Sequence, residues 1–254
     1  MHKPQNAKVR YGMVINLDRC IGCGTCMMAC AMENNVPLTP MKADFTRGIT
    51  WMRVTEADNG AGFPKVDSVR IPVPCQHCDN PPCLHVCPVT AVETDHRTGI
   101  VAQIPTRCMG CRYCMVACPY HARYFNWWDP KFPSDKALNP DVSPRMRGVA
   151  EKCNFCHGRL QRAEQKAAAE GRKELEDGEY VTACADACPS KAIVFGNLRD
   201  ENSAVAKLVK RKFSFRLLES LKTAPKVYYY SEREWVRNAA KNPGVVAGKE
   251  VPHG

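Results

Sequence analysis

Short runs of alternating apolar and polar residues predict small strands that each lead into a short helix. Residues 9–15 fit a strand, and the residues after Cys26 fit a short helix. Residues 71–73 fit a second extended segment, which is again followed by a short helix. Residues 92–104 then predict a hairpin with residues 95–99 as its turn.

The same order of strand and helix returns later in the chain, where two inserts interrupt it. Two further short helices are followed by largely apolar segments, residues 122–128 and residues 193–196. Residues 129–150 contain four prolines and predict a loop that runs over the surface. Residues 159–176 are rich in Ala, Glu, Gln, Lys and Arg, and they predict a solvated helix.

The C-terminal part of the chain follows a different pattern. Residues 204–212 have helical character, residues 227–230 are apolar and aromatic, and the residues after Lys241 have the pattern of an extended tail. No run approaches the ~20 apolar residues that a membrane-spanning helix needs. The first residues also lack the apolar core of a secretory signal. We therefore expect a chain that does not cross a bilayer itself.

Cysteine is the part of the composition that changes this picture most. The 254-residue chain has 16 cysteines, which form four groups of four with none left over. Groups one and three have the spacing CxxCxxCxxxC, the middle gap of group two grows to four residues, and a long insertion divides group four. In chain order the groups are Cys20, Cys23, Cys26 and Cys30; Cys75, Cys78, Cys83 and Cys87; Cys108, Cys111, Cys114 and Cys118; and Cys153, Cys156, Cys184 and Cys188.

This spacing favours iron–sulfur clusters over disulfides and zinc. Disulfide frameworks are typical of small secreted domains, and a zinc site has no use for a third cysteine in such a run. Two-residue gaps let a tight loop bring three thiolates to one cluster, and the fourth cysteine of the run ligates the other cluster of a pair. We therefore expect four [4Fe–4S] clusters, with one [3Fe–4S] centre as the less favoured alternative. The histidines near the cysteines are expected to be supporting or surface residues: His77, His85, His121 and His157.

The four groups could pair in chain order or nest as one with four and two with three. Only a hairpin separates groups two and three, whereas 44 residues separate groups one and two and 34 separate groups three and four. Nesting is favoured, and the predicted fold class is α+β with two nested bacterial-ferredoxin-like (βαββαβ) modules. The predicted parts are an outer module of residues 1–60 and 145–198, an inner module of residues 61–128, a loop insert of residues 129–144, and a C-terminal partner-docking extension of residues 199–254.

Nesting assigns each cysteine to one cluster. The expected ligand sets are cluster A with Cys20, Cys23, Cys26 and Cys188; cluster B with Cys30, Cys153, Cys156 and Cys184; cluster C with Cys75, Cys78, Cys83 and Cys118; and cluster D with Cys87, Cys108, Cys111 and Cys114. Because every cysteine is committed to a cluster, we expect no catalytic residue and no catalysis by this chain alone.

The clusters also change the charge balance. The formal net charge is +10, and four oxidised cubes with their thiolates, each about −2, would leave roughly +2. A nucleic-acid partner is therefore not expected. Residues 191–254 hold 13 Lys and Arg against 6 Asp and Glu, which fits a solvated face or a surface that docks an acidic partner or lipid headgroups.

The motifs at 108–127, Lys152-Cys153-Asn154-Phe155-Cys156 and Thr223-Ala224-Pro225-Lys226-Val227-Tyr228-Tyr229 resemble a known family. They are similar to the four-cluster ferredoxin subunits of complex iron–sulfur molybdoenzymes over about residues 8–232. Members of that family are subunits of dimethyl sulfoxide, polysulfide, tetrathionate and nitrate reductases. Its relatives are subunits of menaquinone reductase and alternative complex III. Cys111 stands where the nitrate-reductase branch has tryptophan, so that route to a three-iron centre is absent.

The resemblance implies a non-catalytic electron relay within a hetero-oligomer. The implied partners are a large molybdopterin-type or derived catalytic subunit, a multi-helix polysulfide-reductase-type membrane subunit that reacts with quinone, and in some complexes a multi-haem cytochrome c. It also implies a linear order, with cluster A nearest the catalytic subunit and cluster D nearest the quinone. It supports the nested ligand sets as well.

The same resemblance bears on location. We expect a peripheral protein of a membrane complex, with the periplasmic face favoured because relatives cross the membrane bound to a partner that carries a twin-arginine signal. The cytoplasmic face is the alternative. The alternative function is a soluble polyferredoxin carrier or the electron-input subunit of a hydrogenase-type enzyme. A soluble carrier would purify alone, whereas a bridging subunit would purify with its partners.

Overall fold

The structure is a computed structural model that describes residues 8–37, 47–132 and 138–247. It has the expected α+β character, with short helices around four small sheets. The first half of the chain contains β1 (Tyr11–Asn16), α1 (Thr25–Glu33), β2 (Met52–Asp58), β3 (Ser68–Pro74), α2 (Pro82–His85), β4 (Val92–Thr94), β5 (Val101–Gln103), η1 (Pro105–Arg107), α3 (Tyr113–Ala117) and β6 (Tyr124–Phe125). The second half contains β7 (Ala150–Glu151), α4 (His157–Ala169), α5 (Ala183–Asp186), β8 (Ile193–Asn197), α6 (Ala204–Val209), β9 (Ser214–Phe215), η3 (Glu219–Leu221), β10 (Val227–Tyr230), α7 (Glu234–Ala239) and α8 (Pro243–Ala247).

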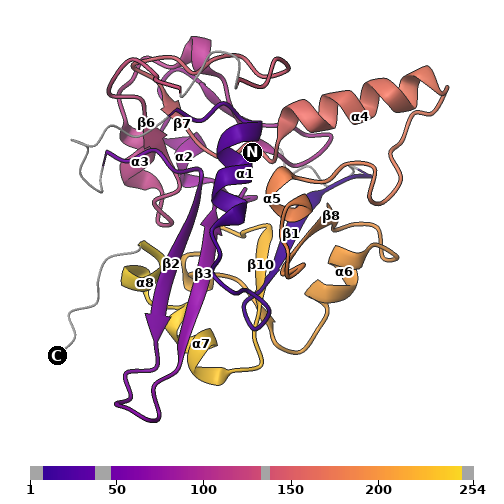
Figure 1. The fold of residues 1–254 in the computed structure, drawn as a ribbon. Helices are drawn as coiled ribbons and strands as arrows, with labels where there is room; N and C mark the ends of the chain where they lie inside the picture. The colour runs from indigo at the N-terminus through magenta and orange to yellow at the C-terminus, as the bar shows by residue number, and fades with distance from the viewer. Residues whose placement is uncertain (1–7, 38–46, 133–137, 248–254) are drawn as a thin grey trace.

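The main sheet has the strand order β8-β1-β10-β9 and joins both ends of the chain (Figure 1). β1 pairs antiparallel with β8, with Met13 opposite Phe195, and parallel with β10, with Ile15 opposite Tyr229. The pairing of β1 with β8 brings the strand before group one next to the strand after group four. It therefore joins the two segments that the sequence assigned to one outer module.

The position of β10 shows that part of the C-terminal segment belongs to the core. Residues 199–254 were predicted to form a partner-docking extension, and within them Val227 and Tyr229 of β10 are fully buried inside the main sheet. α8 lies within the predicted extended tail, and its Val246 is fully buried as well. The apolar residues of this segment pack against the core, so this part of the chain completes the fold. Residues 248–254 lie outside the described ranges.

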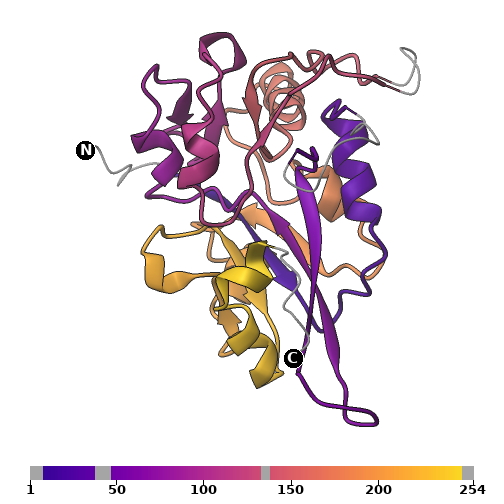
Figure 2. The same cartoon turned by 90° about the vertical axis from the view of Figure 1, so that its left-hand side faces the viewer.

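The segments around groups two and three also differ from a complete βαββαβ sheet. The strands that frame these groups, β3 and β6, pair with β2 and β7 and not with each other. β2 was not predicted, and β7 begins at Ala150, the last residue of the segment that was expected to be a loop, residues 129–150. The predicted hairpin is present as β4 and β5, with Val92 opposite Gln103. Figure 2 shows that the segment with α2 and α3, in magenta, and the violet helix α1 lie on opposite sides of the molecule.

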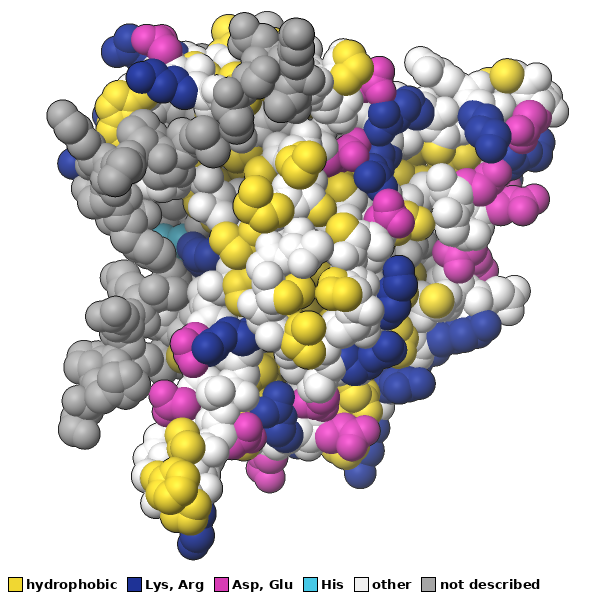
Figure 3. Space-filling view, in the orientation of Figure 1, with side chains coloured by type: hydrophobic (Ala, Val, Ile, Leu, Met, Phe, Trp, Pro, Cys, Tyr) yellow, Lys and Arg dark blue, Asp and Glu magenta, His cyan; other side chains and the backbone are white. Residues whose placement is uncertain are grey.

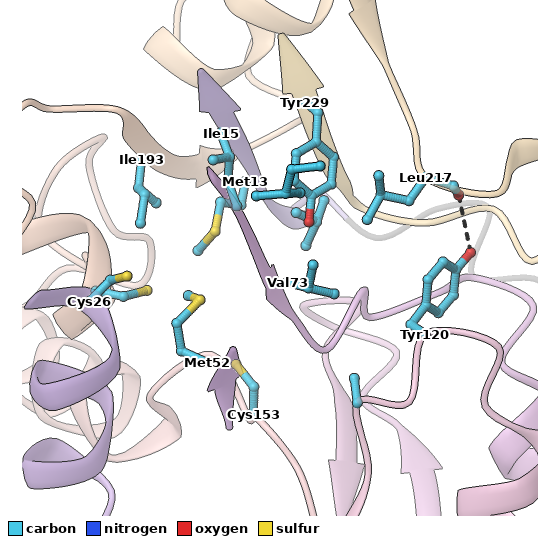
Figure 4. Packing of buried hydrophobic residues seen from close by; sticks show 14 of the residues in the cluster. Met13, Ile15, Cys26, Met52, Val73, Tyr120, Cys153, Ile193, Leu217 and Tyr229 are labelled. Carbon is cyan, nitrogen blue, oxygen red and sulfur yellow. Dashed lines mark hydrogen bonds between the residues drawn. The ribbon is translucent and has the colours of Figure 1, made fainter. Parts of the chain in front are cut away.

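The hydrophobic core lies between the main sheet and the β2–β3 ribbon (Figure 4). Met13 and Tyr229 of the main sheet and Val73 of β3 are each at most 1% exposed. Cys26 and Cys153 belong to the same core cluster. Because cysteines contribute to the core itself, whatever the thiols bind becomes part of the packing of the protein.

The solvated helix predicted over residues 159–176 is present in part as α4, which ends at Ala169 and projects from the body of the molecule (Figure 1). Only Leu160 and Ala167 of its side chains are buried. Within the described residues, none of the helices has both the length and the apolar character needed to traverse a bilayer.

The close packing of β1 against its neighbours gives a stability prediction. A Cβ atom at Gly12 would lie 2.4 Å from Leu198 Cδ1 and 2.7 Å from the Lys226 carbonyl oxygen. Gly12→Ala should therefore lower the free energy of unfolding by about 1–3 kcal/mol, since a backbone atom cannot move aside easily. Gly62→Ala is the control, because a Cβ there meets nothing within 4 Å. Thermal unfolding of the purified complex measures both, and equal stability of the two variants would contradict the packing argument.

Candidate metal centres

The thiols of Cys20, Cys23, Cys26 and Cys188 line a single cavity. Cys20 and Cys23 come from the loop before α1, Cys26 lies in the first turn of α1, and Cys188 follows α5 much later in the sequence. Gly22 and Gly24 have φ values of 70° and 74°, a left-handed conformation that glycine adopts without strain. These two glycines turn the loop around the cavity. The expected ligands of cluster A therefore lie together.

The electrostatics of these thiols favour a cationic metal. Burial raises the pKa of Cys26 to about 11, and the negative charges of Cys20, Cys188 and Cys23 act in the same direction. Crowded, buried thiols remain protonated unless a cation compensates their charge. Iron supplies that charge, so these side chains fit an iron–sulfur cube.

The expected ligands of cluster B are also close together. Burial is the main cause that raises the pKa of Cys30 well above its usual value. The negative charges of Cys153, Cys156 and Cys184 raise it further. The amide nitrogen of Asn34 lies 3.7 Å from Cys156 Sγ and 3.9 Å from Cys30 Sγ. The Asn34 side chain, 2% exposed, therefore offers a donor to two sulfurs of this set, a contribution that the sequence did not indicate.

A second cavity is lined by Cys75, Cys78, Cys83 and Cys118, the expected ligands of cluster C. Burial raises the pKa of Cys78 to about 12, with the charge of Cys75 as the next cause. Cys75 and Cys78 belong to the loop before α2, Cys83 lies in α2, and Cys118 follows α3. The loop of group two and the end of group three therefore converge on one site.

Three of the four expected ligands of cluster D lie in a small second core, which also contains Cys83 of set C. Cys114 is buried there, and Cys87 and Cys108 pack against it. Two sulfurs accept backbone hydrogen bonds: the amide of Ala91 donates to Cys87 Sγ at 3.2 Å, and that of Ala150 to Cys108 Sγ at 3.5 Å. Cys111 is exposed. Ala150 belongs to β7, so this strand supports the group-three loop.

Neighbouring sets are within electrostatic reach of one another. Burial is the main cause that raises the pKa of Cys184 in set B, and the charge of Cys26 from set A adds to it. Burial likewise raises the pKa of Cys153 in set B and of Cys114 in set D, with added effects from Cys75 and Cys83 of set C. These interactions link set A with set B, set B with set C and set C with set D.

One backbone feature recurs in all four groups. The residue before the second cysteine has a positive φ in each case: 70° at Gly22, 42° at His77, 77° at Gly110 and 54° at Phe155. The two residues that are not glycine stack on each other, with ring centroids 3.6 Å apart. Both rings are fully buried, so this stack joins the loop of group two to the loop of group four.

The histidines have supporting positions of different kinds. His77 Nδ1 accepts a hydrogen bond of 3.2 Å from the amide of Val101, which fixes the buried ring. His85 Nε2 lies 3.1 Å from Asn80 Oδ1. His121 is exposed, and His157 is the first residue of α4. The importance of His77 could have been found in the sequence from its place before Cys78, the place that glycine occupies in groups one and three.

Comparison with known protein families agrees with this chemistry. Two family models described as "4Fe-4S dicluster domain" match residues 66–133 and 107–192. A third, described as "4Fe-4S binding domain", matches residues 11–32. Together they cover all four cysteine groups, so the chain binds multiple [4Fe–4S] clusters, and a count of four is consistent with its 16 cysteines.

Curated relatives are similar over nearly the whole chain. The iron–sulfur cluster-binding subunit of menaquinone reductase from Nitratidesulfovibrio vulgaris is 52% identical over 239 residues, which cover 92% of this chain and 94% of the relative. Iron–sulfur subunit 1 of an Hdr-like menaquinol oxidoreductase from Archaeoglobus fulgidus is 35% identical, covering 87% and 83%. The iron–sulfur subunit of arsenate respiratory reductase from a Shewanella species is 35% identical, covering 87% and 96%.

The group-three loop allows a specific test of the centres. Gly110 has a φ of 77°, and a Cβ there would lie 2.6 Å from the Gly148 carbonyl oxygen. Gly110→Ala should displace the loop between Cys108 and Cys111 and lower the iron content by up to about four atoms per chain. Gly60→Ala is the control, because its φ is 68° but a Cβ there meets nothing within 4 Å. Full iron content in both variants would show that the loop tolerates the change.

Proposed function

Because the chain belongs to the family of iron–sulfur subunits of membrane-bound respiratory oxidoreductases, we propose that it relays electrons through four [4Fe–4S] clusters between a large catalytic subunit and a quinone-reactive membrane subunit. The observation that carries the proposal is the row of four cysteine sets, each within electrostatic reach of the next. Each cube, when bound, takes up and gives back one electron. The protein holds the cubes in a fixed order and surrounds them with buried side chains.

The proposed ligands follow the nested arrangement. They are Cys20, Cys23, Cys26 and Cys188 for cluster A; Cys30, Cys153, Cys156 and Cys184 for cluster B; Cys75, Cys78, Cys83 and Cys118 for cluster C; and Cys87, Cys108, Cys111 and Cys114 for cluster D. Support comes from the two cavities lined by four thiols each and from the antiparallel pairing of β1 with β8.

The two ends of the row reach the surface. Of the 16 cysteines, Cys23 and Cys111 are exposed, and they belong to clusters A and D. The cysteines of the middle clusters are buried or partly buried. Electrons can therefore enter and leave at the ends, whereas the middle of the row is insulated from solvent.

Exposed apolar side chains lie beside both ends. Met28 and Met32 on α1 are 64% and 67% exposed, and Tyr113 and Val116 on α3 are 58% and 82% exposed. Figure 3 shows hydrophobic side chains gathered on the face that carries α1, and α1 and α3 lie on opposite sides in Figure 2. Exposed apolar patches are typical of subunit contacts. We assign the α1 surface to the catalytic subunit and the α3 surface to the membrane subunit.

The finer identity of the partners is also part of the proposal. The resemblance favours a molybdopterin-type or derived catalytic subunit and a polysulfide-reductase-type membrane subunit. The relative at 52% identity is named for menaquinone, so menaquinone is the proposed quinone. The resemblance adds a multi-haem cytochrome c as a further partner in some complexes. The periplasmic face of the membrane stays a prediction.

Substitutions on α1 and α3 test the bridge. Val116→Asp should weaken the contact with the membrane subunit, because a charge would be buried in an apolar interface. The complex should then lose quinone-linked activity and keep dye-linked activity of the catalytic subunit. Met28→Asp should instead release the catalytic subunit. Co-purification measures both effects. Leu221→Asp, at a residue that is 51% exposed and outside both helices, is the control. Retention of both partners by the α1 and α3 variants would refute the assignment.

Serine substitutions test the nested ligand sets. Cys30→Ser should alter the same EPR signal as Cys156→Ser, because both remove a ligand of cluster B. Purified wild-type complex should contain about sixteen iron atoms in this subunit. If Cys30→Ser instead alters the signal that Cys78→Ser alters, the groups pair in chain order and the nested model is wrong.

A further inference from the structure

Three cations are buried in the middle of the protein. Lys226 is fully buried, Lys152 is 2% exposed and Arg123 is 3% exposed. Within the described ranges, Glu151 is the one carboxylate that is buried to the same degree, and it lies 4.0 Å from Arg145. Burying a charge is costly unless an opposite charge lies close by. The three cations therefore require more negative charge than the buried carboxylates supply.

The expected ligands of cluster C lie where that negative charge is needed. Arg123 lines the same cavity as Cys75 and Cys83. Burial lowers the pKa of Arg123, but the charges of Cys83, Cys114 and Cys75 outweigh it and raise the pKa overall. The ammonium of Lys152 donates to the carbonyl oxygens of Val101 and, at 2.8 Å, Cys153.

Lys226 reaches the same place from the C-terminal segment. Its Nζ lies 2.9 Å from Asp79 Oδ1, and Asp79 directly follows Cys78. Asp79 also forms an ion pair with Arg10, so one carboxylate serves two cations and one positive charge remains. Burial lowers the pKa of Lys226 to about 7, and the negative charges of Cys78 and Cys75 oppose that shift.

The backbone holds Lys226 in this position. The amide of Asp79 donates to the Ala224 carbonyl at 2.9 Å, and the amide of Lys226 donates to the Gln76 carbonyl at 2.9 Å. These bonds tie the C-terminal segment to the group-two loop on both sides of Cys78. The backbone itself therefore sets the position of the ammonium group.

We propose that Lys226, together with Arg123 and Lys152, balances the charge of cluster C and raises its reduction potential. The inference rests on the proposed four-cluster relay. When bound, cluster C would gain one electron on reduction from a neighbouring cluster, which would lose one electron, and no proton would be transferred. The charge of the cube and its thiolates changes from about −2 to about −3, and a fixed neighbouring cation stabilises the more negative state more strongly. Lys226 is a positioning and tuning residue and not a ligand.

The test is Lys226→Met in the purified complex, followed by a potentiometric EPR titration. The signal of cluster C is identified as the one altered by Cys78→Ser. We expect the reduction equilibrium of that signal to become about tenfold less favourable, a fall of ~59 mV for one electron. Lys222→Met is the matched control, because Lys222 is in the same segment but exposed, and solvent screens its charge. Lys226→Arg keeps the charge and should retain most of the potential.

Each other outcome decides against the proposal or against the relay on which it rests. An unchanged midpoint in Lys226→Met, or an equal shift of all four signals, overturns the inference. If Lys226→Met does not assemble, Arg123→Gln takes its place, with the same expected fall in the same signal; an unchanged midpoint there overturns the inference as well. If wild-type complex lacks the four clusters by iron content and EPR, the proposed relay itself is wrong, whatever the variants show.

Discussion

The repulsion among buried, crowded thiols is the constraint on which the rest of the structure depends. Burial and neighbouring thiolates raise the pKa of Cys78 and Cys184 to about 12 each, so these sites favour the neutral thiol until iron is present. The core is therefore completed by the cofactors. Backbone amides at two sulfurs of set D and the Asn34 amide at set B then stabilise the charge that remains.

That constraint explains the unusual path of the chain. Cluster A needs thiols from both ends of the cysteine framework, and the antiparallel pairing of β1 with β8 brings these ends together. β10 then packs on the other side of β1 and brings Lys226 to the middle of the molecule. The C-terminal segment thus places a positive charge in the interior of the protein, which its basic composition alone did not indicate.

The sequence predicted the parts that depend on local spacing. The CxxC runs, the strand of β1, the hairpin of β4 and β5 and the helix α4 were all visible, because each follows from neighbouring residues. The partners of β3 and β6, the interior place of β10 and the burial of α8 were missed, since they depend on contacts between distant segments. The stack of His77 on Phe155 was missed for the same reason.

That stack has a consequence for how such a protein can be altered. The two rings occupy the same motif position in groups two and four, and each lies in a backbone conformation that side chains rarely adopt. Neither loop can change this residue without leaving a gap or a clash against the other. The segment that contains groups two and three therefore cannot be exchanged alone for that of a relative. A chimaera must take both His77 and Phe155, or both of their replacements, from the same protein.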